Sequence, residues 1–94
     1  MNKQVKSAYK PPSVVVLVKQ LTDKSMSRLY ELLRVHGAKG LKIIVESDRP
    51  AQALEALRDF LFSNYAFTVE VYIANPGRGY ELASKAGSLV AILE

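Results

Sequence analysis

A strand–helix–strand pattern over residues 14–46 places the strongest constraint on how this chain folds. Two mostly aliphatic runs, VVVLV at 14–18 and LKIIV at 41–45, are typical of strands that are buried on both faces. Between them, apolar residues recur at the spacing of one face of an amphipathic helix, at Met26, Leu29, Tyr30 and Leu33. Two buried strands joined through a helix form a βαβ unit with parallel strands and a right-handed crossover. Such a unit has an open strand edge and little core, so the rest of the chain has to complete it.

Capping residues are expected at both ends of this first helix. Thr22 or Asp23 can accept a hydrogen bond from the free N–H groups of the first turn. At the other end, Gly37 is expected to take the left-handed conformation that closes a helix, and His36 beside the last carbonyl groups suits the helix dipole. These roles are a sufficient structural account of the only histidine in the sequence.

A second helix is predicted after Ser47-Asp48-Arg49-Pro50, which combines a capping side chain with a proline in the first turn. The predicted inward stripe of this helix consists of Pro50, Ala53, Leu54, Leu57 and Leu61. Ala56 and Phe60 lie to one side of the stripe and widen the apolar surface beyond what one core face needs. The surplus indicates that this helix also contacts a partner.

The C-terminal part predicts two further strands. Residues 67–73 alternate apolar and polar side chains, which indicates a strand with one buried face, and residues 89–93 form a last aliphatic strand. The connection, about residues 74–87, begins with Ala74-Asn75-Pro76-Gly77-Arg78-Gly79, which is typical of a turn. It is long for a hairpin loop, so we interpret it as a protruding arm or a flexible loop. The predicted order is βαβαββ, an α+β fold.

Length and composition indicate one ordinary globular domain. The chain has 94 residues, of which 49% are hydrophobic and 23% charged. Residues 1–12 have no hydrophobic period and end in Pro-Pro, so we expect a basic flexible tail followed by a single domain over 13–94. The absence of cysteine favours a reducing compartment, and no stretch resembles a signal peptide or membrane span. We therefore expect a cytoplasmic protein.

The net charge of +4 is unevenly distributed along the sequence. Residues 1–42 hold nine Lys or Arg against two acids, a net +7, whereas residues 43–94 hold four against seven, a net −3. This asymmetry favours a basic surface directed at a polyanion, or a contact between opposite charges on two copies. Lysine-rich helical surfaces that serve only solubility explain it equally well.

The residues offer little for catalysis. With no cysteine and one histidine there is no cluster of metal ligands, and no nucleophile or carboxylate pair has a recognisable catalytic setting. Gly77-Arg78-Gly79 lies between two predicted strands and lacks the strand-to-helix setting of a phosphate loop. We therefore expect no enzyme activity, no cofactor and no metal.

Basic residues in three segments favour nucleic acid as a partner. They lie in the tail (Lys10 among them), in the first strand-to-helix loop and in the arm, at Lys19, Lys24, Arg78 and Lys85. Such side chains bind phosphates without reading sequence, and an arm that carries Arg has the shape and charge to enter a minor groove.

The predicted order and spacing resemble the Alba family of archaeal chromatin proteins. Pro12-Ser13-Val14-Val15-Val16-Leu17-Val18 is similar to the opening strand of that family, and the nineteen-residue step from Val18 to Gly37 is similar to its first loop and helix. Ile43-Ile44-Val45-Glu46-Ser47-Asp48-Arg49, followed by a helix in Ala and Leu, is similar to its second strand and basic turn. The likeness covers roughly residues 12–73.

This resemblance implies a two-layer fold with two helices on one face of a four-stranded mixed sheet. It also implies a homodimer built from the second helix and the C-terminal strands, which here places Leu57, Phe60, Leu61 and Tyr72 at the interface. The family grips duplex DNA or RNA with little sequence preference, and its loop and turn contacts fall at Lys19, Gln20 and Arg49. The chain departs from the family where Gln20-Leu21 replaces a Lys-Pro pair and where Asp48 precedes Arg49.

Three functions are consistent with these residues. The first is a nucleoid-associated dimer that binds duplex DNA or structured RNA through phosphates, using the cations named above. The second is a protein-interaction or assembly module that uses the apolar edge of the second helix. The third is a small regulatory domain that binds an anionic ligand at the dimer seam.

Overall fold

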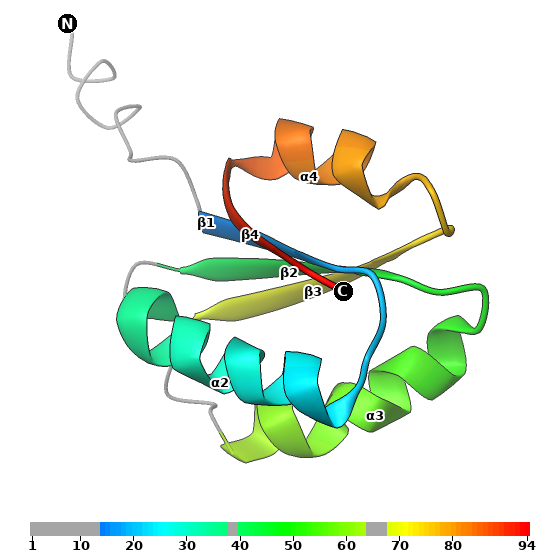
Figure 1. The fold of residues 1–94 in the computed structure, drawn as a ribbon. Helices are drawn as coiled ribbons and strands as arrows, with labels where there is room; N and C mark the ends of the chain where they lie inside the picture. Colours follow the sequence, from blue (N-terminus) through cyan, green and yellow to red (C-terminus); the bar gives the residue numbers. More distant parts are fainter. Residues whose placement is uncertain (1–13, 38–39, 64–67) are drawn as a thin grey trace, which may run out of the picture.

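A computed structural model describes residues 14–37, 40–63 and 68–94 (Figure 1). Along the chain its elements are β1 (Val14–Val18), α2 (Asp23–His36), β2 (Leu41–Glu46), α3 (Pro50–Ser63), β3 (Val69–Ala74), α4 (Gly79–Ala86) and β4 (Ser88–Leu93). Lys10 and the rest of the predicted tail lie outside the described residues.

The four strands form one sheet in the order β3-β2-β1-β4, and every neighbouring pair is parallel. The pairing of β1 with β2 is regular from Val14 opposite Leu41 to Val18 opposite Val45. The pairing of β1 with β4 shifts between Val15 and Val16, because Val15 faces Leu89 whereas Val16 faces Ala91. Val90 is therefore the extra residue of a β-bulge in β4.

Helices cover both faces of this sheet, so the domain has three layers (Figure 1). Helices α2 and α3 lie on one face, and α4 lies on the other. Two separate clusters of buried side chains reflect this arrangement. The larger cluster includes Val16 and Val18 with residues of α2 and α3, and the smaller includes Val15 and Leu17 with Ala83 of α4.

The handedness of parallel crossovers explains why α4 lies alone. Each step from β1 to β2 and from β2 to β3 moves in the same direction across the sheet, so their right-handed crossovers place α2 and α3 on one face. The step from β3 to β4 moves back past β2 and β1. The same handedness then places α4 on the opposite face.

The prediction of a βαβαββ order with a mixed sheet and helices on one face only was wrong. Residues 74–87, interpreted as an arm or loop, contain the turn at 75–77 and the crossover helix α4. The fully buried residues of α4, Gly79 and Ala83, are small, and its large apolar side chains, Tyr80 and Leu82, are exposed, so no large apolar residues mark its inward face. The two last strands and the βαβ unit at 14–46 were predicted correctly.

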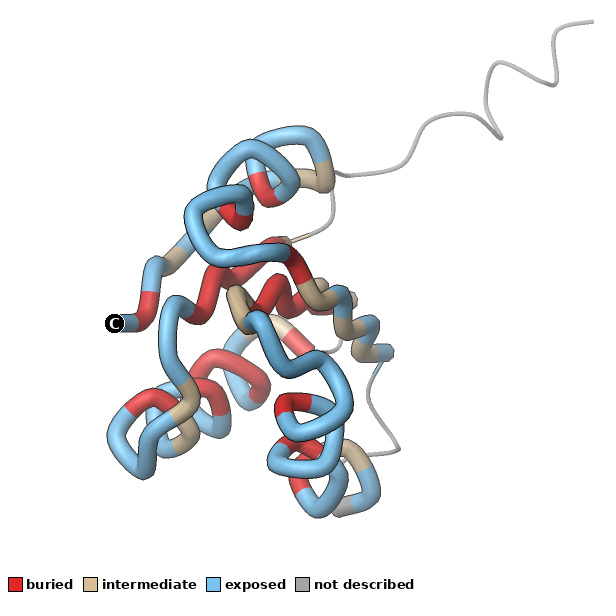
Figure 2. The backbone as a smooth tube through the Cα atoms, turned by 90° about the vertical axis from the view of Figure 1, so that its right-hand side faces the viewer, coloured by how far each residue is buried: buried red, intermediate tan, exposed pale blue. Residues whose placement is uncertain are grey.

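The inward face of α3 also differs from the prediction. Ala53, Leu57 and Phe60 are buried at 5%, 0% and 1% exposure, whereas Leu54 is 47% exposed. The ring of Phe60 meets that of Tyr30 from α2 edge to face, with centroids 4.7 Å apart. The placement of Leu57 and Phe60 at a dimer interface is therefore wrong, because both side chains fill the core. Figure 2 shows the buried positions of the helices as short segments between exposed ones.

The two ends of α2 illustrate one correct and one incorrect capping prediction. Thr22 is the N-cap, and its hydroxyl and the Ser25 hydroxyl each accept a hydrogen bond from the other residue's backbone N–H, which forms a capping box. Gly37 continues the last turn with a φ of −58° and is not left-handed. The left-handed glycine is Gly40, with a φ of 97°, where the chain enters β2.

The burial pattern of α3 predicts that Phe60 contributes far more to the free energy of unfolding than Phe62. Phe60→Ala is expected to lower the free energy of unfolding by about 3–5 kcal/mol, because it leaves a cavity in the core. Phe62→Ala is the matched control, since the Phe62 side chain is 69% exposed in the single chain, and it should change the stability of the monomer by no more than about 0.5 kcal/mol. Urea denaturation followed by circular dichroism measures both values, and equal losses would contradict the assigned face of α3.

Candidate functional site

The carboxyl edge of the sheet is the first candidate site, because parallel strands bring the loops that follow them to one edge. The structure places five of the predicted nucleic-acid contacts there: Lys19, Gln20, Lys24, Arg49 and Arg78. Lys85 lies nearer the C-terminal end of α4, although it lines the same shallow hollow as Arg78 and Glu81. That end is at the amino edge of the sheet, where the Lys42 Nζ at the start of β2 donates to the Ala86 carbonyl at 3.2 Å.

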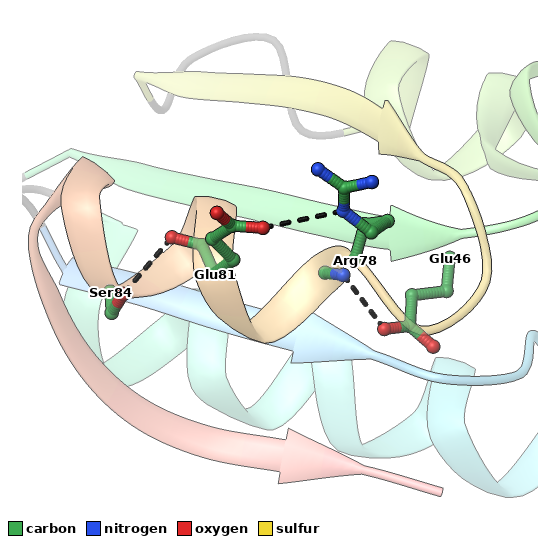
Figure 3. Close-up of polar contacts among 5 residues, drawn as sticks. Glu46, Arg78, Glu81 and Ser84 are labelled. Carbon is green, nitrogen blue, oxygen red and sulfur yellow. Dashed lines mark hydrogen bonds and ion pairs between the residues drawn. The ribbon is translucent and has the colours of Figure 1, made fainter.

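Glu46 forms the structural centre of this edge. Its side chain is only 6% exposed at the end of β2, and Oε2 accepts a hydrogen bond of 2.8 Å from the Gly79 N–H at the start of α4 (Figure 3). A carboxylate at this position satisfies a free N–H of the helix and suits the positive end of the helix dipole. Oε1 lies 3.9 Å from the Lys19 Nζ. Glu46 thus joins β1, β2 and α4.

Gly79 is required for this contact. A Cβ atom at this position would lie 2.6 Å from Leu17 Cδ1 and 2.7 Å from Glu46 Oε2, distances too short for non-bonded atoms. The absence of a side chain allows α4 to approach the sheet closely. The sequence analysis did not identify Glu46 as a functional or structural residue; an acidic residue that closes an otherwise buried strand was the available signal.

The charges at the carboxyl edge are mixed. Lys19 lies near Glu46, and Arg78 Nε is 3.3 Å from Glu81 Oε1 (Figure 3). An acid directly precedes each of two other cations in the sequence, Asp23 before Lys24 and Asp48 before Arg49. This edge is therefore not a continuous basic surface.

The described residues as a whole are balanced in charge. They contain nine Lys or Arg and nine Asp or Glu. The four remaining basic residues, which account for the net charge of +4, lie outside the described residues at Lys3, Lys6, Lys10 and Lys39. The described residues therefore carry no net charge.

The outer face of α3 is the second candidate site. Leu54 and Phe62 expose 47% and 69% of their surface on a helix whose other face fills the core. They belong to a shallow hollow, named here the α3 surface, that is lined by Ala51, Leu54, Glu55, Arg58, Leu61 and Phe62. Leu61 is half-buried beside them, so it alone of the predicted α3 interface residues reaches this surface.

Charged and aromatic groups are organised along the α3 surface. The Arg58 guanidinium lies 3.4 Å from Glu55 Oε2, and its Cζ is 5.9 Å from the centroid of the Phe62 ring. Both contacts are exposed, so each contributes little to stability. They hold Arg58 in the middle of the surface, between an acid and a ring.

Tyr72, the fourth predicted interface residue, lies away from α3 on the edge strand β3. Its side chain is 43% exposed, and its hydroxyl donates a hydrogen bond to Glu70. That hydrogen bond and the negative charge of Glu70 raise the pKa of Tyr72. The structure does not bring Tyr72 and Leu61 together on one surface.

Neither a metal centre nor a membrane span is found in the part of the chain that the structure describes. No three His, Cys, Asp or Glu side chains there are placed to hold a metal ion. No helix among the described residues is both long and apolar enough to cross a bilayer. Comparisons with known proteins find no matching family model, no matching curated protein and no matching solved structure.

The geometry at Glu46 predicts a graded loss of stability. Glu46→Ala should lower the free energy of unfolding by about 1–3 kcal/mol, because it leaves a buried N–H of α4 without an acceptor. Glu46→Gln keeps an acceptor oxygen and should cost less. Lys19→Met should cost less than about 1 kcal/mol, because the Lys19 side chain is 43% exposed. Denaturation in urea provides the three values, and a loss for Lys19→Met as large as that for Glu46→Ala would contradict the capping role.

Proposed function

We propose that this chain is a protein-interaction module that forms homodimers through the α3 surface. The observation that carries the proposal is the exposure of Leu54 and Phe62, two large apolar side chains, on a helix that already provides core residues. Exposed apolar surface that is rimmed by charged residues is typical of an interaction site. This exposure supports an assembly function of the second helix better than nucleic-acid binding. The residues that support it, Leu54 and Phe62, differ from Ala56 and Phe60, which the sequence indicated.

The spacing of the α3 surface suits packing against another helix. Its members lie at positions 51, 54, 55, 58, 61 and 62, which follow the three- and four-residue steps of a coiled-coil seam. The core residues of α3, at 53, 57 and 60, lie on the other side of the helix. One helix therefore serves two contact faces, one toward the sheet and one toward solvent.

The charges on this surface support a second copy of the chain as the partner. In a two-fold dimer with antiparallel α3 helices, contacts are reciprocal between the two copies. A register that sets Glu55 against Arg58 of the partner copy also sets Ala51 against the partner's Phe62. A negative group then meets a positive one, and the smallest apolar side chain meets the largest, twice in each dimer.

Charge reversal tests this register. Glu55→Arg and Arg58→Glu should each weaken self-association at least tenfold, because each variant alone places like charges against one another. An equimolar mixture of the two variants should associate as a heterodimer, since every charge then meets its opposite. Sedimentation velocity over a concentration series measures the dissociation constants, and a mixture that associates no more strongly than the separate variants would contradict the register.

An apolar variant and its matched control test the surface itself. Leu54→Glu should abolish association through the α3 surface, whereas Ala56→Glu places the same charge at an exposed position outside the α3 surface and should leave that association intact. Unchanged circular dichroism would show that both variants are folded. Self-association of Leu54→Glu that is as strong as that of the unmodified chain would overturn the proposed function.

A second candidate function, binding of duplex DNA or RNA through phosphates, is favoured by one observation. Lys19, Lys24 and Arg78 come from different elements and lie at the same carboxyl edge, together with Arg49. Ion pairs of exposed side chains are weak, so phosphates can compete for these cations. A nucleoid-associated location would follow from this second function alone. Of the two cations predicted in the arm, Arg78 lies at this edge and Lys85 does not, because the segment forms α4.

Salt-dependent binding distinguishes this candidate. If it holds, labelled duplex DNA should bind with an affinity that falls with salt, and Lys19→Gln and Arg49→Gln should each lower the log–log slope by about 0.9. Lys85→Gln is the matched control, because Lys85 lies near the opposite edge of the sheet. Fluorescence anisotropy at several salt concentrations gives the slopes, and the absence of binding at low salt would remove nucleic acid as a partner.

A further inference from the structure

Among the described residues, the outer edge of β4 is an unpaired strand edge with little protection. The order β3-β2-β1-β4 leaves one side of β3 and one side of β4 unpaired within the described residues. Proteins usually protect such edges with charged residues or proline. β3 carries the exposed Glu70, whereas β4, with the sequence SLVAIL, has neither a charge nor a proline.

Apolar side chains accompany this edge. Val90 and Ile92 are 41% and 45% exposed, so β4 presents apolar surface together with free N–H and C=O groups. The bulge at Val90 is the one protective feature of this edge. It lies near the middle of the strand and leaves the residues after it in regular register with β1, from Ala91 opposite Val16 to Leu93 opposite Val18.

A groove runs between this edge and α2. Its α2 side is formed by Lys24, Ser25, Ser27, Arg28 and Glu31, and its β4 side by Ile92, Leu93 and Glu94. Residues 24, 27, 28 and 31 form one outward stripe along α2, because they follow the i, i+3, i+4, i+7 spacing of one helical face. An added strand beside β4 would therefore lie along a charged helical stripe.

We infer that a second copy of the chain pairs its β4 antiparallel with this edge and extends the sheet across a two-fold axis. The order of charges along α2 supports this occupant. A two-fold axis that reverses β4 also reverses α2, so Lys24 of one copy is directed toward Glu31 of the other, and Ser27 toward Arg28. The stripe is thus complementary to itself in the antiparallel direction, whereas a parallel arrangement would set like charges side by side.

The β4 edge and the α3 surface are far enough apart to be used together. β3 and β4 form opposite edges of the sheet, and α3 packs along β3. A chain with two self-complementary faces forms assemblies larger than a dimer. This larger assembly rests on the proposed function of the α3 surface, whereas the β4 pairing by itself does not.

Two substitutions, alone and combined, test the inference. Val90→Lys places at the β4 edge the kind of charge that blocks edge pairing, and Leu54→Glu blocks the α3 surface. We expect the unmodified chain to form species larger than dimers, each single variant to form dimers, and the double variant to be monomeric. Sedimentation velocity at several protein concentrations determines the species.

The outcomes separate the two proposals. If the unmodified chain forms only dimers that Leu54→Glu abolishes and Val90→Lys leaves intact, the β4 pairing is overturned and the α3 dimer stands. If Val90→Lys abolishes the only dimers and Leu54→Glu has no effect, the β4 pairing stands and the proposed function fails. A monomeric chain at all concentrations overturns both.

One further variant controls for effects of the added charge on folding, and a second tests the arrangement of the α2 helices. Tyr72→Lys introduces the same charge on the opposite edge strand and should leave β4 pairing intact. Lys24→Glu changes an exposed side chain of the α2 stripe and should weaken the β4 pairing about tenfold in the Leu54→Glu background. Loss of pairing with Val90→Lys but not with Lys24→Glu would overturn the proposed antiparallel arrangement of α2.

Discussion

Parallel pairing of β1 on both of its sides is the constraint on which the rest of the structure depends. Residues 15–18 are 0–1% exposed, so both faces of this strand have to be covered by helices. Helices α2 and α3 cover one face, and only a crossover that returns from β3 past β2 and β1 can cover the other. That crossover is α4, and its short length and small buried residues, Gly79 and Ala83, allow close contact with the sheet.

Glu46 shows how one polar group stabilises this arrangement. Its carboxylate binds a backbone N–H of α4 and lies near Lys19, so the ends of β1 and β2 and the start of α4 are held at one point. Because the Glu46 carboxylate is engaged in these contacts, it is not free to bind a ligand or act in catalysis. The carboxyl edge, where parallel folds commonly bind ligands, is thus partly occupied by the structure's own interactions.

In the folded chain, the proposed function rests on exposed apolar side chains rather than on charge. The described residues have equal numbers of acids and bases, so the net positive charge of the sequence comes from residues outside them. The exposed apolar side chains do define positions, on α3 and along β4. A domain of this size buries a modest core, and association through such surfaces gives it additional stability.

The sequence by itself determined the elements with a strong period: the βαβ unit at 14–46, the start of α3 at Pro50, and the strands near 69–74 and 88–93. It could not determine α4, because the inward residues Gly79, Ala83 and Ala86 follow a helical spacing but are too small to give a clear apolar signal. Nor could it fix the inward face of α3, because apolar residues surround much of that helix. Strand order and helix side depend on contacts between distant segments. Only the tertiary structure could therefore decide that Phe60 is core, that Leu54 and Phe62 are exposed, and that Lys85 lies away from Lys19.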